Sequence, residues 1–205
     1  WRPTNNDIDS LKAEGCWNND WDASHELLTR HLKNQGKEIQ IPSKKEIIEI
    51  FSNFYFGSAQ NSESRNWNGF INNEDLLVSR AFFHELSNQN IGWGFVSGAE
   101  VPSARFVLEE RIGLDNPPLI AMGNAPDKPD PTGLIRLATE LLSRPLGKGT
   151  PQIAYLGDTV TDVETVQRAR KLVPEQTFIS LAVIPPHLKK EDLLDERLTY
   201  TNQLK

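Results

Sequence analysis

The chain has 205 residues, of which 38% are hydrophobic, and its net charge at pH 7 is -6. This length and composition suit a folded chain with a buried core and exclude a wholly disordered one. The acidic balance and the scattered lysines and arginines argue against a nucleic-acid-binding surface. No apolar run reaches the ~18 to 20 residues that cross a bilayer, so no membrane partner is expected. The single cysteine, Cys16, cannot form an internal disulfide, and we expect a soluble, cytoplasmic protein.

Helical patterns fill almost all of the first 90 residues. Thr4 is positioned to cap a first helix, and Ser43 with Glu46 three residues later forms a capping box ahead of another. Residues 57–69 are rich in serine and asparagine, which predicts a loop. The predicted helices cover residues 4–15, 22–36, 43–54 and 73–88.

Short apolar runs alternate with helical patterns in the rest of the chain. The predicted strands cover residues 91–96, 118–122, 153–156 and 178–184. The predicted helices cover residues 103–112, 130–142, 161–169 and 188–204, with Asp130 and Pro131 as N-cap and first residue of the second. Strands separated by helices of this length form βαβ units with right-handed crossovers, so the sequence predicts an α/β fold with a parallel sheet.

One stretch, I-A-Y-L-G-D-T-V-T-D at residues 153–162, joins a strand to a helix through two carboxylates. Asp158 follows the strand directly, and Asp162 lies one helical turn later, with Thr161 and Glu164 as a capping box. Open α/β sheets bind ligands at this end of their strands, and Mg²⁺ prefers oxygen ligands. The pair therefore predicts a Mg²⁺ site. The alternative is that Asp158 caps the helix and Asp162 is a solvated acid at its start.

Two other strand ends carry side chains that suit a phosphoryl group. Ser97 and Gly98 follow the first strand, and Lys128 follows the second. Ser97 could donate to a phosphate oxygen, and Lys128 could neutralise charge that develops in phosphoryl transfer. The alternatives are that Ser97 only forms a turn and that Lys128 is a solvated loop lysine.

These motifs carry a family resemblance. F-V-S-G at 95–98, D-K-P-D-P at 127–131 and L-G-D-T-V-T-D at 156–162 resemble motifs two, three and four of the haloacid dehalogenase superfamily. With helices ahead of motif two, the chain looks like the phosphoglycolate phosphatase and β-phosphoglucomutase branch. The resemblance implies a helical cap over residues 1–72 and a Rossmann-like core over residues 73–205. It also implies a Mg²⁺-dependent phosphatase that hydrolyses a small phosphorylated metabolite, a sugar phosphate or a phosphoglycolate-like compound, through an aspartyl-phosphate.

The first motif of that superfamily, a strand that ends in D-x-D with the nucleophile, has no match here. The only D-x-D, Asp20 to Asp22, follows Trp17 and two asparagines instead of an apolar strand, so we reject it as the nucleophile. We expect the first and last strands of the family fold, and the nucleophilic aspartate, to lie outside residues 1–205.

Residues 17–22 match the part of such caps that closes over the site. We expect Trp17, Asn19, Asp20 and Trp21 to contact a polyol or sugar leaving group. The alternative is that Asn19 or Asp20 caps a helix while the tryptophans pack. Two other functions stay open: a phosphomutase of the same superfamily, and a non-catalytic binding protein with the same sheet.

Overall fold

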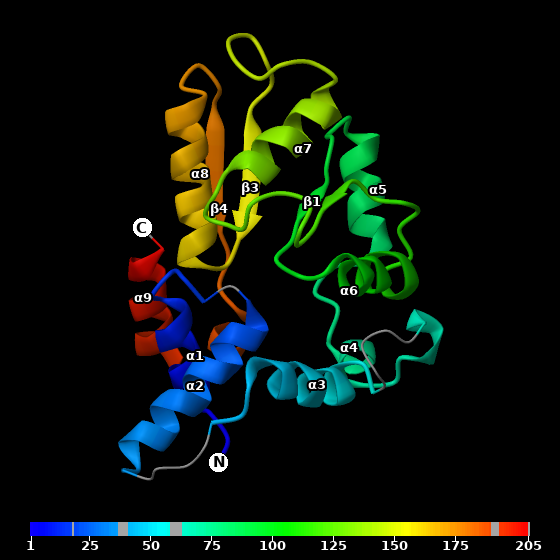
Figure 1. Cartoon of the computed structure of the whole chain (residues 1–205). Helices are drawn as coiled ribbons and strands as arrows, with labels where there is room; N and C mark the ends of the chain where they lie inside the picture. The colour runs from blue at the N-terminus through cyan, green and yellow to red at the C-terminus, as the bar shows by residue number, and fades with distance from the viewer. Residues whose placement is uncertain (18, 37–40, 58–62, 190–192, 205) are drawn as a thin grey trace. The chain divides into compact units, whose positions relative to one another are not determined.

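The computed structural model describes residues 1–17, 19–36, 41–57, 63–189 and 193–204. The chain forms two compact units, residues 1–18 with 125–205 and residues 19–124 (Figure 1). These units do not follow the predicted boundary between residues 72 and 73, because residues 1–18 pack with the second half of the chain. The division into a cap and a core stays a prediction. Within the described ranges, no helix is long and apolar enough to span a membrane.

The first unit contains the parallel strands β3 (Ile153–Gly157) and β4 (Phe178–Ala182), paired in register from Ile153 opposite Phe178 to Gly157 opposite Ala182. Its helices are α1 (Asn5–Lys12), α7 (Thr132–Leu142), α8 (Val160–Leu172), the short 3₁₀ helix η3 (Pro186–Lys189) and α9 (Leu194–Gln203). Helix α8 lies along both strands, and α7 packs on α8 (Figure 1).

The core of this unit lies on one face of the strand pair. Its buried residues come from α7, α8 and β4 and are Leu134, Val166, Ala169 and Phe178. Ile153 and Tyr155 of β3 pack against these residues. Strand residues alternate between faces, so Leu156 and Leu181, paired across the strands, lie on the other face and are 63% and 44% exposed. Parallel strands are usually covered on both faces. The helices of this unit cover only one face of its strand pair, among the described residues.

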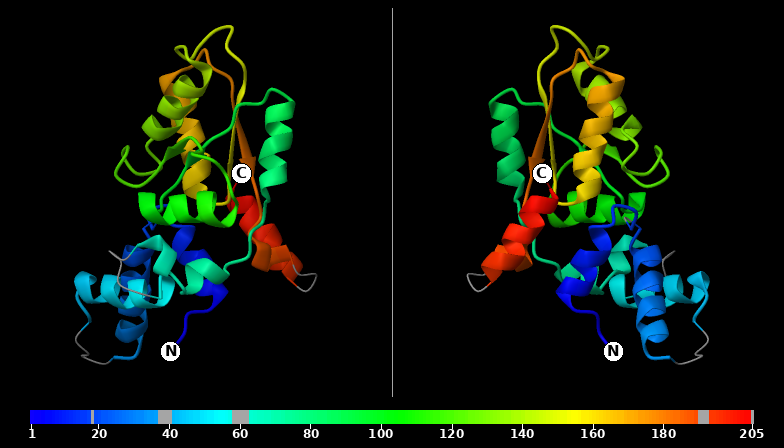
Figure 2. Two further views of the ribbon diagram at one scale, coloured as in Figure 1. Left: turned by 90° about the vertical axis from the view of Figure 1, so that its right-hand side faces the viewer. Right: turned by 90° about the vertical axis from the view of Figure 1, so that its left-hand side faces the viewer.

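The second unit contains the parallel strands β1 (Phe95–Val96) and β2 (Leu119–Ile120). Its helices are α2 (Asp20–Asn34), α3 (Lys44–Tyr55), the 3₁₀ helix η1 (Ser64–Asn66), α4 (Phe70–Asn73), α5 (Arg80–Asn88), α6 (Val101–Arg105) and the π-helical turn η2 (Phe106–Arg111). Helices α2 and α3 pack together, and α3 contacts α4 (Figure 2).

Two buried clusters hold the second unit together. One joins Phe56, Trp67 and Ile71 to Phe106 of η2, and the other packs α5 on β1 and β2 through Phe83. A Cβ atom on Gly69 would lie 2.3 Å from the backbone nitrogen of Gly57. The two backbone segments can therefore approach this closely only because residue 69 has no side chain.

The early helix starts are confirmed: Thr4 and Ser43 each form a capping box, and α3 has Glu46 as the box partner. The predicted helix over residues 73–88 is wrong in its first half, since α5 begins at Arg80. The guanidinium of Arg111 binds the carbonyl oxygens of Ile71 and Glu74, and a helix that began at residue 73 would need the Glu74 carbonyl for one of its own N–H groups. Part of the predicted 57–69 loop, residues 58–62, lies outside the described residues.

Three further expectations need correction. The capping box of α8 is formed by Thr159 with Asp162, not by Thr161 with Glu164. Pro131 is the N-cap of α7, and Thr132 its first residue, one position later than predicted. The strands are parallel as expected, but the described residues form two separate pairs instead of one sheet, and β1 and β2 have two residues each.

Candidate active site

The turn between β3 and α8 is built around the side chain of Asp162. Its Oδ2 atom accepts hydrogen bonds from the Thr159 backbone N–H at 3.1 Å and from the Thr159 hydroxyl at 2.7 Å. The Asp162 N–H reaches back to Thr159 Oγ1 at 3.3 Å, which closes the capping box. The helix start therefore fixes one oxygen of the carboxylate.

The second oxygen of Asp162 faces Lys128. Lys128 Nζ donates to Oδ1 at 2.6 Å, and the Tyr155 hydroxyl donates to the same atom at 3.2 Å. The side chains of Lys128 and Asp162 are 18% and 6% exposed. Burial opposes the charged carboxylate, but the Lys128 ammonium and the donors from Lys128 and Thr159 outweigh it and hold the pKa of Asp162 below its ordinary value. Asp162 therefore stays ionised at neutral pH with both oxygens engaged.

Gly157 gives this carboxylate its space. A Cβ atom at position 157 would lie 2.4 Å from both Cβ and Cγ of Asp162. In the structure the close approach at Gly157 is that of the Asp162 side chain.

Asp158 differs from Asp162 in its exposure and in the contacts of its carboxylate. It is exposed, and among the described residues its carboxylate makes no hydrogen bond or ion pair, whereas its backbone carbonyl accepts from the Tyr200 hydroxyl. A carboxylate at a strand end fits one position around Mg²⁺, which keeps several waters. The described residues contain no group of three or more possible metal ligands, so the rest of such a shell would have to come from elsewhere.

Ser97 and Gly98 belong to the second unit. The Ser97 N–H donates to the Ile120 carbonyl at 2.8 Å, and its hydroxyl oxygen accepts from the Ala99 N–H at 3.0 Å. Ser97 thus forms the turn that follows β1, which is the alternative considered for it. Its meeting with Lys128 around a phosphate stays a prediction.

Trp17 lies in the first unit and is anchored near the start of α8. Its indole N–H donates to Glu14 at 2.8 Å, and the neighbouring Gly15 carbonyl accepts from the Thr161 hydroxyl at 3.2 Å. Thr161 is fully buried and immediately precedes Asp162. The segment that carries Trp17 therefore packs against the helix turn that holds the acids.

Asn19, Asp20 and Trp21 lie in the second unit, at the start of α2. The Asn19 side chain accepts from the N–H groups of Trp21 at 3.0 Å and Asp22 at 3.2 Å, so Asn19 is the N-cap. Burial, with the charges of Glu74 and Asp20, raises the pKa of the Tyr55 phenol to about 12. A contact between these residues and substrate stays a prediction.

Two tyrosines that donate hydrogen bonds to the β3–α8 turn were not identified from the sequence. Tyr155 lies two residues before Gly157, so strand alternation puts both on the same face, and this signal was available. Tyr200 comes 42 residues after Asp158, and no local pattern links them.

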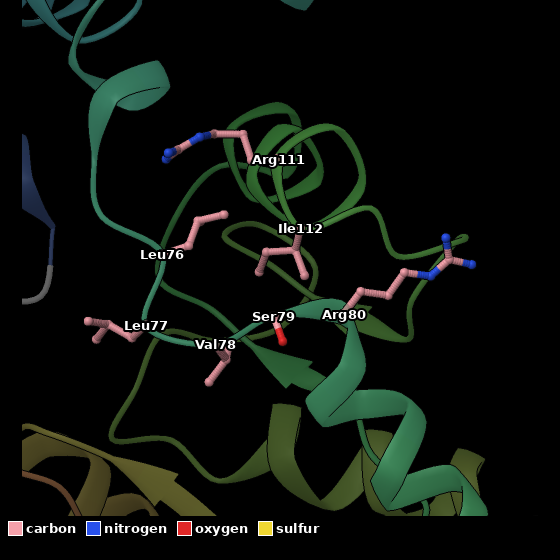
Figure 3. A pocket seen from close by; sticks show the side chains of 7 residues that line it. All are labelled: Leu76, Leu77, Val78, Ser79, Arg80, Arg111 and Ile112. Atoms are coloured by element: carbon pink, nitrogen blue, oxygen red, sulfur yellow. The ribbon is translucent and has the colours of Figure 1, made fainter.

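A separate cavity of about 400 Å³ opens in the second unit (Figure 3). It lies between the segment that follows α4 and the end of η2, and its lining consists of Leu76, Leu77, Val78, Ser79, Arg80, Arg111 and Ile112. In Figure 3 the side chains of Arg80 and Arg111 extend to opposite sides, and Arg111 is engaged by the Ile71 and Glu74 carbonyls. None of the predicted site residues lines this cavity.

The described elements define a mixed α/β protein with parallel strand pairs flanked by helices. Its fold is similar to that of phosphatase Tt82 from Thermococcus thioreducens, with a TM-score of 0.58 and 20% sequence identity, over 100% of this chain and 84% of that one. No model of a known protein family matches the chain.

The chain is also similar in sequence to an enzyme of another description. An imidazoleglycerol-phosphate dehydratase of Phytophthora nicotianae is 26% identical over 195 residues. The match covers 94% of this chain and 38% of that protein, so the chain spans well under half of that relative's length.

Proposed function

We propose that this chain forms part of a Mg²⁺-dependent phosphatase of the haloacid dehalogenase type. It would hydrolyse a small phosphorylated metabolite, such as a sugar phosphate or a phosphoglycolate-like compound, through an aspartyl-phosphate. The observation that carries the proposal is the β3–α8 turn, where a lysine paired to a buried aspartate lies beside a second aspartate whose carboxylate is exposed. The similarity of fold to a phosphatase agrees with it.

Lys128 has the central electrostatic role in this proposal. Its ammonium is held by Asp162 Oδ1 at 2.6 Å, so its position is set before a substrate arrives. A positioned cation stabilises charge that develops on phosphoryl oxygens, and removal of one such group costs about 100-fold or more in rate. Asp162 would thus act through Lys128, and Ser97 would add a hydroxyl donor to the phosphate.

Asp158 would hold the metal ion. When bound, Mg²⁺ would neutralise charge on the phosphate and orient it for in-line attack. The chain's own contribution is an exposed carboxylate on a turn whose other polar groups are engaged.

The nucleophile would be an aspartate on a further strand, outside residues 1–205. Among the described residues β1 pairs with β2 and β3 with β4, so each pair has edges to which such a strand could bond. A strand of this kind would bring its carboxylate to the carboxyl ends of parallel neighbours, where Asp158 and Lys128 lie in their unit.

Residues 17–22 would select the leaving group. Trp17, Asn19, Asp20 and Trp21 combine aromatic faces with hydrogen-bonding groups, which suits a polyol or sugar. We expect Asp20→Ala and Trp21→Ala to change the order of preference among phosphorylated metabolites. Hydrolysis of a small aryl phosphate should stay within about tenfold of wild type, ~1.4 kcal/mol in barrier. A collapse of aryl phosphate turnover in folded Asp20→Ala would place Asp20 in the catalytic machinery.

The test is turnover by the full-length protein. Release of inorganic phosphate should be measured for an aryl phosphate and a panel of phosphorylated metabolites, imidazoleglycerol phosphate included, with Mg²⁺ and with EDTA. We expect Mg²⁺-dependent release that Lys128→Ala reduces by about 100-fold or more. Asp115→Asn, an exposed aspartate in a loop of the second unit, is the control and should match wild type.

Two outcomes would favour the other functions. Conversion of a sugar phosphate to its positional isomer, without net phosphate release, would indicate a phosphomutase. Binding of phosphate esters without turnover by any of the panel would indicate a non-catalytic binding protein and contradict the proposal.

A further inference from the structure

The backbone carbonyl of Asp158 is the first one beyond the β3–β4 ladder. The ladder ends where the Val183 N–H donates to the Gly157 carbonyl at 2.9 Å. Within the described part of the chain, the next carbonyl, that of Asp158, has no strand partner and accepts instead from the hydroxyl of Tyr200 on α9. A residue of the last helix therefore takes over where the sheet stops.

Tyr200 is itself held in place. Its side chain is 9% exposed and packs with Leu188 and Leu204 on the first turn of α8, where Val160 and Val163 contribute. The packing around the ring holds the hydroxyl against the Asp158 carbonyl.

Together these contacts fix the backbone around Asp158 on both sides. Val183 binds the carbonyl before it, Tyr200 binds its own carbonyl, and Asp162 Oδ2 accepts from the N–H of Thr159 after it. Among the described residues, the Asp158 carboxylate is left without a hydrogen bond. A rigid backbone that presents one unengaged carboxylate is the arrangement expected of a preorganised ligand.

We propose that Tyr200 is a positioning residue that orients Asp158 for a divalent cation, so that α9 belongs to the functional site. This rests on the proposed function through the metal role of Asp158. Hydrogen-bond partners that orient a ligand typically change metal affinity by about 10- to 100-fold when removed. The packing of α9 would thus control how tightly the cation is bound.

The test measures cation binding without turnover. The affinity of the full-length protein for Mn²⁺, which shares the oxygen preference of Mg²⁺, is determined by electron paramagnetic resonance. Tyr200→Phe keeps the ring and removes the hydroxyl, and we expect about tenfold weaker binding with a thermal midpoint close to wild type. Tyr55→Phe, the same change in the second unit, should bind Mn²⁺ as wild type does.

Wild-type affinity in Tyr200→Phe would overturn the proposal, and so would an equal loss in Tyr55→Phe. If Tyr200→Phe does not fold, linkage provides the second measurement on the wild type. Because coupling is reciprocal, saturating Mg²⁺ should slow amide hydrogen exchange in α9, and unchanged exchange would overturn the proposal.

Asp158→Asn separates this proposal from the proposed function. If it abolishes Mn²⁺ binding, the metal role of Asp158 stands whether or not hydrolysis is detected, and Tyr200→Phe decides the inference. If it binds Mn²⁺ as wild type does, the metal role fails and the inference fails with it. Absence of phosphatase activity alone contradicts only the proposed function.

Discussion

The ends of β3 and β1 carry the two halves of the predicted site, and they differ in how firmly the chain holds them. After β3, the carboxylate of Asp162 accepts four hydrogen bonds, from Thr159, Lys128 and Tyr155. After β1, the hydroxyl oxygen of Ser97 accepts one hydrogen bond from the described residues, that of the Ala99 N–H. The first is a buried, charged network that supports a helix start, and the second is a local turn.

This difference shows that one side chain can support the fold and a proposed site at once. Asp162 forms the capping box of α8 and binds Lys128, so its loss should disturb the fold and, under the proposed function, the chemistry. Ser97 makes one local side-chain contact in its turn, so its loss should disturb the fold little. Mutations should therefore have large effects on stability at the end of β3 and small ones at the end of β1.

The largest effect on stability is expected from Gly157→Ala. The new Cβ atom would overlap Asp162, which must move and break its ion pair with Lys128. Breaking a buried ion pair costs about 3 to 5 kcal/mol, and urea unfolding should show it. Gly92→Ala, next to β1, is the control, since its Cβ would meet nothing within 4 Å. A small change in Gly157→Ala would mean that the turn adapts and that the comparison is wrong.

Lys128→Met should cost about 3 kcal/mol at neutral pH, because the carboxylate of Asp162 remains buried and loses its cation. The pH dependence follows from the lowered pKa of Asp162. Its contribution to stability is present above the unfolded value of ~3.9 and is lost as the pH falls through the lower folded value. In Lys128→Met the loss should begin at a higher pH, which unfolding curves between pH 3 and pH 7 would detect.

Lys44→Met is the matched control for that experiment. Lys44 pairs with Asp22 at 2.5 Å in the second unit, but the two side chains are 55% and 41% exposed. Exposed pairs contribute about 0 to 1 kcal/mol, so stability should change little at any pH. Similar losses in Lys44→Met and Lys128→Met would contradict the distinction between the two pairs.

The smallest effects come from the hydroxyls at the two strand ends. Thr159→Ala removes the N-cap of α8 and should cost about 1 to 2 kcal/mol in the free energy of unfolding. Ser97→Ala removes one exposed acceptor and should cost less than about 1 kcal/mol, while phosphate affinity falls. A larger loss in the free energy of unfolding for Ser97→Ala than for Thr159→Ala would contradict the comparison.

The sequence predicted those parts of the fold whose signals are local. The capping box at Ser43, the strand at residues 153–156 and the acids at the start of α8 all lie within a few residues of their partners. The prediction that Thr161 and Glu164 form the capping box of α8 was wrong, because a second pair with the same spacing, Thr159 and Asp162, overlaps it and forms the box. Asp162 is the N3 residue of α8 and also binds Lys128.

Features that depend on distant contacts could not be predicted. The start of α5 at Arg80 goes with a distant contact, since the Arg111 guanidinium binds the Glu74 carbonyl that a helix from residue 73 would use. The hydrogen bond of Tyr200 to Asp158 spans 42 residues and has no sequence pattern. One distant contact, that of Lys128 with Asp162, was expected because strand ends of parallel βαβ units meet, which is a rule of topology and not of local sequence.

The central claim is that Asp158 binds the metal ion directly while Asp162 acts through Lys128. The measurement is the Mg²⁺ dependence of aryl phosphate hydrolysis by the full-length protein, with Asp158→Asn compared to Asp162→Asn and wild type. We predict that Asp158→Asn raises the Mg²⁺ concentration for half-maximal activity by about 100-fold, and Asp162→Asn by about tenfold or less. Identical Mg²⁺ titration curves for Asp158→Asn and wild type would contradict the claim.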